Sequence, residues 1–129
     1  MKPAKMPTQP NTEAINDRAK LLAHRLIARQ LATDPDLIPR ARQVISEWRA
    51  MGHQHDVLDE WDRLLTLDPA QLRRLIIERS ETMTRLRISS PLGLASGLFT
   101  DDDSLRRRIR RKARNGLLLA AKRKADATA

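Results

Sequence analysis

The sequence has no cysteine and no tyrosine, and its aromatic residues are one phenylalanine and two tryptophans. Without cysteine there is no disulfide bond, no thiolate nucleophile and no cysteine-ligated zinc site. No run approaches the roughly 18 apolar residues of a membrane span, so a cytoplasmic location is the default expectation. Single-stranded nucleic acid is bound largely by stacking bases on aromatic side chains. Since Trp48 and Trp61 are expected in the core, this class of binding is disfavoured.

The abundant residues favour helices. Leucine occurs 19 times and alanine 16 times, whereas valine occurs twice. Leucine and alanine favour helices, strands favour β-branched and aromatic residues, and no segment alternates cleanly between apolar and polar positions. We therefore expect an all-α protein, a small bundle of about five helices with a basic C-terminal helix.

Prolines and capping residues divide the chain into three parts. Residues 1–10 contain three prolines and two lysines and are expected to form a disordered leader. Residues 11–100 are expected to form the helical body, and residues 101–129 the basic C-terminal helix or arm. Polar side chains that can cap a helix N-terminus mark the expected helix starts. These capping residues are Asn11 or Thr12, Asp34, Asp56, Asp68 and Thr100.

Within the body, helical periodicity predicts which residues face inward. Gly52 is expected to end the second helix, and the helix after Asp68 is expected to break near Ser80. Residues 89–100, rich in serine and glycine, are expected to form a packed loop. His24 is expected at the surface or flank of the first helix. The main residues expected to face inward are Ile15, Ala19, Leu22, Leu26, Leu31, Leu37, Ala41, Val44, Ile45, Trp48, Leu58, Trp61, Leu72, Met83, Leu86, Leu92, Leu94, Leu98 and Phe99.

The net charge is concentrated in residues 104–125, which contain ten lysines and arginines and no acid. The chain carries +9, so the remainder, with 15 basic and 16 acidic residues, is nearly neutral. Leu105, Ile109, Ala113 and Leu117 recur every four residues and predict an apolar seam by which this helix docks. The basic side chains would then face outward. The candidate binding residues are Arg106, Arg107, Arg108, Arg110, Arg111, Lys112, Arg114, Lys122, Arg123 and Lys124.

Such a helix favours a polyanionic or acidic partner, because no acid in it relieves the repulsion among its arginines. A guanidinium group binds phosphate with two hydrogen bonds and can read guanine edges. The expected partner is nucleic acid, as duplex DNA or structured RNA, or an acidic protein. Residues 117–119 are three leucines that cannot all face one seam, so they are either buried or meet a partner or a second copy in a homodimer. Binding to a membrane surface is disfavoured, because arginines cover most of the helix.

The candidates for catalysis are acidic residues around Trp61. They could act as acid and base or hold a metal, but acids in the first turn of a helix also stabilise its dipole, and we favour that role. These acids are Asp56, Asp59, Glu60 and Asp62.

The sequence predicts no enzyme, no cofactor and no metal. His53 and His55 supply two of the roughly four ligands that zinc needs. Neither a phosphate-binding glycine loop nor a nucleophile motif occurs.

The run DEWDRLLTLDPAQLRRLI, followed by TRLRISSPLGLASGLF, resembles small helical bacterial antitoxins of toxin–antitoxin modules. This resemblance covers about a third of the chain. It implies a non-enzymatic regulatory protein that contacts a toxin and its own operator. The basic C-terminal helix would then bind nucleic acid, the partner toxin, or both. The alternative is a protein-interaction adaptor or inhibitor that binds an acidic partner and no nucleic acid.

Overall fold

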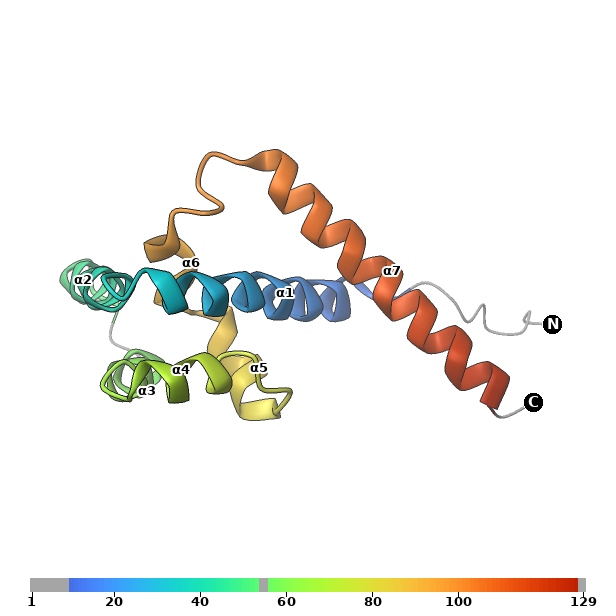
Figure 1. Cartoon of the computed structure of the whole chain (residues 1–129), viewed down its shortest axis with the longest axis horizontal. Coiled ribbons are helices and arrows are strands. Elements are labelled where there is room, and N and C mark those ends of the chain that lie inside the picture. The colour runs from blue at the N-terminus through green and yellow to red at the C-terminus, as the bar shows by residue number, and fades with distance from the viewer. Residues whose placement is uncertain (1–9, 54–55, 128–129) are drawn as a thin grey trace.

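The structure, a computed structural model, describes residues 10–53 and 56–127 and contains seven helices in these two ranges, with no strand. The all-α prediction is confirmed. Apart from Pro10, the predicted leader lies outside the described residues, as does His55. Figure 1 shows α1 at the centre, with α7 crossing above it and α3, α4 and α5 below. The helices are α1 (Thr12–Thr33), α2 (Leu37–Ala50), α3 (Asp56–Leu64), α4 (Pro69–Leu75), α5 (Glu81–Ile88), α6 (Pro91–Ser96) and α7 (Asp103–Ala127).

Helix α1 packs on two sides. Its N-terminus is capped as predicted, because the Asn11 side chain accepts a hydrogen bond from the backbone N–H of Ala14 at 2.7 Å. One side faces the body through Leu21, Ile27 and Leu31, which are buried. The other side carries Leu22, Leu26 and Ala19, which are half-buried and face α7. The apolar residues expected on one face of α1 therefore pack on two sides, against the body and against α7.

His24 is buried in α1 and not at the surface, contrary to the sequence prediction. It is only 3% exposed, and its ring stacks on Trp61 with the centroids 6.4 Å apart. The ring nitrogen Nδ1 lies 2.7 Å from the carbonyl oxygen of Lys20, and Nε2 lies 2.8 Å from the hydroxyl of Ser90. Burial is the main cause that lowers the pKa of His24 to about 4, and the nearby charges of Arg87 and Lys20 add to it. The imidazole is therefore a neutral part of the core.

The connection from α1 to α2 corrects one predicted cap. Asp34 ends α1, and its carboxylate accepts hydrogen bonds from Gln30 at 3.2 Å and Arg40 at 2.7 Å. Helix α2 begins three residues later, at Leu37, because residues 35 and 36 form a turn. The end of α2 is as predicted, since Gly52 follows it with a φ of +94°, a conformation that favours glycine.

Trp61 of α3 lies in the core, where it contacts His24 of α1 and Leu86 of α5. Its side chain is fully buried, and its indole N–H donates a hydrogen bond to the carbonyl oxygen of Leu86 at 2.9 Å. Asp68 caps α4 by accepting from the backbone N–H of Ala70, and the predicted break at Ser80 separates α4 from α5. The hydroxyl of Ser80 accepts from the backbone N–H of Met83 at 3.1 Å. This split is one reason why the described residues contain more helices than the five expected.

The segment expected to be a packed loop contains helix α6. Ser90 caps it, Pro91 occupies the first helical position, and Gly97 ends it with a φ of +71°. Leu92 is fully buried as expected, whereas Leu94 points outward and is 53% exposed. The two side chains lie about 200° apart around the helix axis, so one faces the core while the other faces the solvent. Helix α6 packs mainly on α2.

One arginine, Arg87, is buried in the body of the protein. Arg87 of α5 is buried, and its guanidinium donates hydrogen bonds to the carbonyl oxygens of Ile76 and Glu78, both at 3.0 Å. Burial is the main cause that lowers the pKa of Arg87. These bonds satisfy backbone carbonyls just after α4, so Arg87 has a structural role. Among the described helices none is both long enough and apolar enough to span a bilayer.

Candidate nucleic-acid interface

Helix α7 docks on α1 through the seam expected from its four-residue repeat. Ala113 is fully buried, and Leu105, Ile109 and Leu117 are half-buried. Leu105 and Ile109 share a groove with Leu22 of α1. The complete burial of Ala113 shows that α7 is covered at this position, where a short side chain allows close packing. The seam therefore fixes which side of α7 faces the solvent.

The first turn of α7 corrects a second predicted cap. The carboxylate of Asp102, and not the hydroxyl of Thr100, accepts the hydrogen bond from the backbone N–H of Leu105, at 2.9 Å. Arg106 turns back toward this end, where its guanidinium donates to the carbonyl oxygen of Phe99 and pairs with Asp103. Acidic residues at a helix N-terminus also complement the helix dipole. The start of α7 is thus anchored by its own side chains.

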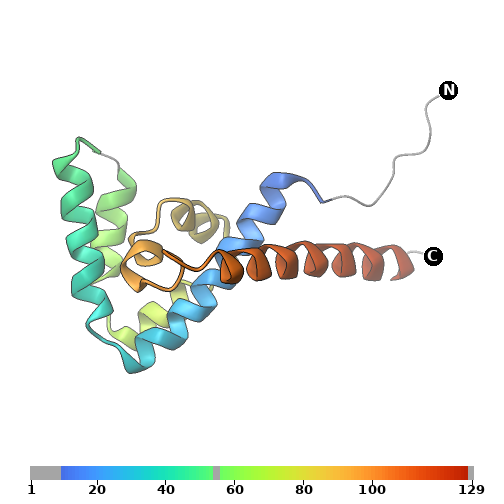
Figure 2. The same cartoon turned by 90° about the horizontal axis from the view of Figure 1, so that it is seen from above.

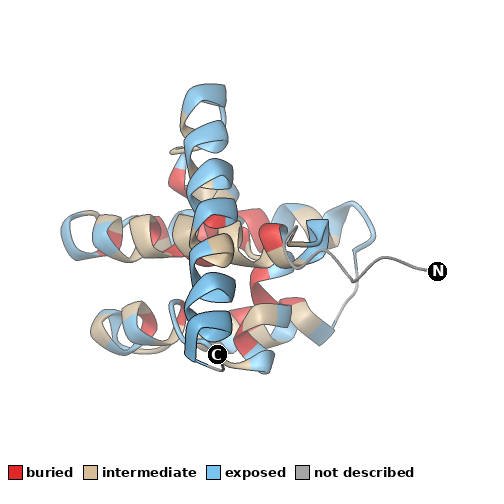
Figure 3. Cartoon of the chain, turned by 90° about the vertical axis from the view of Figure 1, so that its right-hand side faces the viewer, coloured by how far each residue is buried: buried red, intermediate tan, exposed pale blue. Residues whose placement is uncertain are grey.

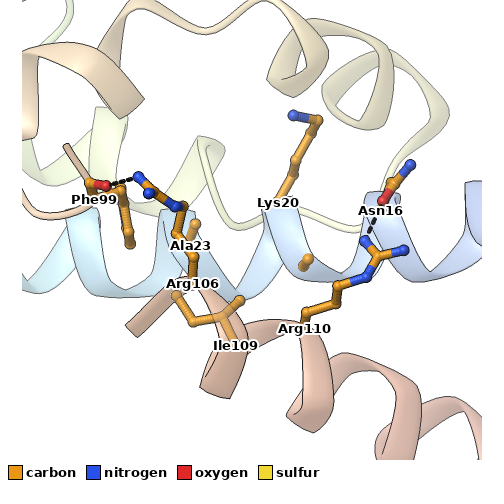
Figure 4. A pocket seen from close by; sticks show the side chains of 8 residues that line it. Asn16, Lys20, Ala23, Phe99, Arg106, Ile109 and Arg110 are labelled. Atoms are coloured by element: carbon orange, nitrogen blue, oxygen red, sulfur yellow. Dashed lines mark hydrogen bonds between the residues drawn. The ribbon is translucent and has the colours of Figure 1, made fainter. Parts of the chain in front are cut away.

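Two of the ten predicted cations, Arg106 and Arg110, form hydrogen bonds in a groove along one edge of α7. Arg106 and Arg110 line it together with Asn16, Lys20 and other residues of α1 (Figure 4). The Arg110 guanidinium donates a hydrogen bond to the side-chain oxygen of Asn16 at 2.6 Å. Ile109 lies between the two arginines and points toward α1 in the same view. These two arginines hold the helix in place.

A second groove, on the opposite edge of α7, contains only cationic and apolar side chains. Arg25 and Arg29 of α1 face Arg108 and Lys112 of α7 across it, and its cavity volume is about 350 Å³. Its apolar lining consists of Leu22, Leu26, Leu105 and Ile109.

The sequence prediction missed Arg25 and Arg29. Their spacing of four residues puts them one above the other on the helix, with no acid between them. The sequence alone shows this pair of arginines, but only the packing of α7 on α1 shows that they face Arg108 and Lys112.

The remaining predicted cations are spread along the outer side of α7. Arg107 and Arg111 lie one helical turn apart, opposite Ile109, and both are exposed. Figure 3 shows most of α7 exposed. The helix extends beyond α1, as Figure 2 shows, so the C-terminal cations lie apart from the others along the helix. Arg114 and, farther along, Lys122, Arg123 and Lys124 are also exposed.

The leucines after Gly116 lie where α7 leaves the body. Leu117 and Leu118 are half-buried, and Leu119 is 47% exposed. The three side chains therefore do not share one environment, as the sequence indicated. The C-terminal part of α7 therefore exposes an apolar side chain, Leu119, near basic side chains.

Three of the four acidic residues around Trp61 form ion pairs. Arg49 contacts Asp59 and Asp62, each at 2.6 Å, and Arg85 contacts Glu60 at 3.0 Å. Hydrogen bonding and attraction to Asp62 raise the pKa of Arg49. In the described ranges no three acidic or histidine side chains gather as a metal site would require. These ion pairs link α2 to α3 and α3 to α5, so the acidic residues help to hold the helices together.

Comparison with known proteins gives no relative for this chain, since no protein-family model, no curated protein and no solved structure matches it.

Proposed function

We propose that this chain is a non-enzymatic regulatory protein that binds double-stranded nucleic acid through the outer side of α7. The observation that carries the proposal is the position of Arg107 and Arg111. Both are exposed opposite the docked seam, and neither forms an ion pair within the described part of the chain. An unpaired guanidinium group on a fixed helix is ready to bind a phosphate with two hydrogen bonds.

A duplex fits this surface better than a single strand. Duplex DNA carries one negative charge per about 1.7 Å of helix axis, so a row of arginines meets several phosphates at once. Binding to single strands depends on exposed aromatic rings. Here Trp61 is fully buried, and Trp48 and Phe99 pack against the core. Duplex DNA and structured RNA are therefore the proposed ligands.

A second candidate is an acidic protein partner, such as the toxin implied by the resemblance to antitoxins. The exposure of Leu119 between Arg114 and Lys122 favours it, because interfaces combine apolar contacts with arginine. In this case the projecting end of α7 would meet the partner. A complex that survives nuclease treatment in a pull-down supports this candidate.

The test is duplex binding as a function of salt, measured by fluorescence anisotropy with labelled DNA and RNA duplexes. The two variants are Arg111→Glu on α7 and Arg63→Glu on α3, which lies on the far side of α1 from α7 (Figure 1). Both replaced arginines are exposed, and both substitutions change the net charge equally. Loss of one phosphate contact reduces the slope of log affinity against log salt by about 0.9.

We expect Arg111→Glu to weaken binding and flatten the salt dependence, while Arg63→Glu leaves both close to the wild type. An equal loss in the two variants would mean that only the total charge matters, and α7 would not be the binding site. Absence of duplex binding by the wild type at low salt would refute the proposal.

A further inference from the structure

Two groups of arginines in the helical body differ in their partners. Arg40, Arg49 and Arg85 donate hydrogen bonds to carboxylates and hold helices together. A second group forms no ion pair and donates no hydrogen bond to any side chain or backbone atom within the described part of the chain. Its members include Arg25 and Arg29 of α1 and Arg73 and Arg74 of α4.

These four arginines meet in one groove between α1 and α4. The groove has a cavity volume of about 580 Å³, and no acidic side chain lines it. Three of its other lining residues are alanines, so the polar groups that line the groove are the four guanidinium groups. The full apolar lining is Ala28, Ala32, Ala70 and Ile77.

Arg25 and Arg29 also belong to the groove between α1 and α7. They therefore lie between α4 on one side and Arg108 and Lys112 of α7 on the other. Figure 1 shows the same order, with α7 above α1 and α4 below. We call the six cations of these two grooves the basic band: Arg25, Arg29, Arg73, Arg74, Arg108 and Lys112.

Like charges gather near this band. Burial is the main cause that lowers the pKa of Arg18, and repulsion from Arg79 and Arg25 adds to it. The Nε atom of Arg18 is buried and has no hydrogen-bond partner. Repulsion between close cations costs free energy, and a bound polyanion would reduce this cost.

We propose that the sugar–phosphate backbone of a duplex lies along the basic band, so that Arg73 and Arg74 of α4 hold phosphates together with α7. This rests on the proposed function and adds a second contact surface to it. Packed helices lie about 8–10 Å apart, so the band spans roughly 20 Å from α4 to α7. That length of duplex carries about 12 phosphates, more than enough for six cations. Contacts to phosphates position the duplex without reading its sequence.

The test compares the double variant Arg73→Gln/Arg74→Gln with the wild type and with Arg63→Gln, all in the full chain. The probes are a labelled 20-base-pair DNA duplex and an RNA duplex of the same length. Glutamine keeps the helical preference of arginine and removes its charge. Circular dichroism and thermal melting verify that each variant is folded.

Two lost phosphate contacts should reduce the salt slope by about two and weaken binding by roughly ten- to hundredfold near 0.1 M salt. The loss should be the same for duplexes of different sequence. Arg63→Gln should change neither the slope nor the affinity.

Each other outcome decides against the band in a distinct way. If Arg73→Gln/Arg74→Gln binds like the wild type while Arg111→Glu is impaired, the band is wrong and the proposed function stands. If the wild type binds no duplex, both are wrong. If polyglutamate of equal charge displaces the duplex as well as unlabelled duplex does, the band is a site for acidic proteins and the proposal fails.

Discussion

Protonation of His24 should destabilise the fold at mildly acidic pH. The carbonyl oxygen of Lys20 can only accept a hydrogen bond, so Nδ1 carries the ring hydrogen and Nε2 accepts from the hydroxyl of Ser90. A second proton would place a charge in the core, beside Trp61 and near Arg87. The neutral ring is therefore the form that the folded protein requires.

The magnitude follows from the difference between the folded and unfolded pKa values. The pKa of His24 is lowered from 6.5 to about 4 in the folded protein, so the unfolded chain binds a proton first as the pH falls. The contribution of His24 to stability is complete above pH 6.5 and is lost between pH 6.5 and pH 4. The lowering of this pKa from 6.5 to about 4 corresponds to about 3 kcal/mol, of which about 2 kcal/mol is lost between pH 7 and pH 5.

The assay is urea unfolding of the wild type and His24→Gln at several pH values from 7 to 4. We expect the wild type to lose about 2 kcal/mol more than the variant between pH 7 and pH 5, because glutamine does not titrate. Titration of the imidazole by NMR gives the pKa directly. A value near 6.5 in the folded protein, or equal pH dependence of the two proteins, would refute the reasoning.

Two further substitutions test local packing. Gly116→Ala should stabilise the protein by up to about 1 kcal/mol, because glycine is unfavourable within a helix; the new Cβ would lie 3.6 Å from Nη2 of Arg18, an ordinary contact. Thermal melting measures this gain, and a lower melting temperature would show that Arg18 cannot adjust. Trp61→Phe should cost about 2 kcal/mol, because it makes a fully buried side chain smaller and removes one of the two donors to the carbonyl oxygen of Leu86, which keeps its hydrogen bond from the backbone N–H of Ser89. Urea unfolding measures that loss, and a cost below about 0.5 kcal/mol would mean that the hydrogen bond contributes little.

Much of the fold follows from local sequence signals. Asn11, Asp68 and Ser80 cap helices at or near the predicted positions, and Gly52 ends α2 as expected. Caps act within four residues, so the sequence contains the information they need. Asp34 and Thr100 were assigned wrongly, because the residue at the actual helix start is an aspartate two positions later, Asp36 or Asp102.

Tertiary contacts explain what the sequence could not predict. His24 is buried because it contacts Trp61 of α3 and Ser90, the residue just before α6, both distant in the sequence. Periodicity identifies the sides of α1 that are apolar, but not which neighbours cover them. In the same way, the cations of α7 were identified from their own segment. Arg73 joins Arg29 only because α4 packs on α1, more than 40 residues later in the chain.

The position of α7 leaves most of its side chains outside the hydrophobic core. The main hydrophobic core and the apolar residues packed against it end at Phe99, and Ala113 is the one fully buried residue in the described part of α7. Substitutions along the outer side of α7 therefore change the charge and shape of this surface at little cost in folding free energy. A lineage of such proteins could accumulate changes in this helix while the hydrophobic core formed by α1 to α6 stays the same.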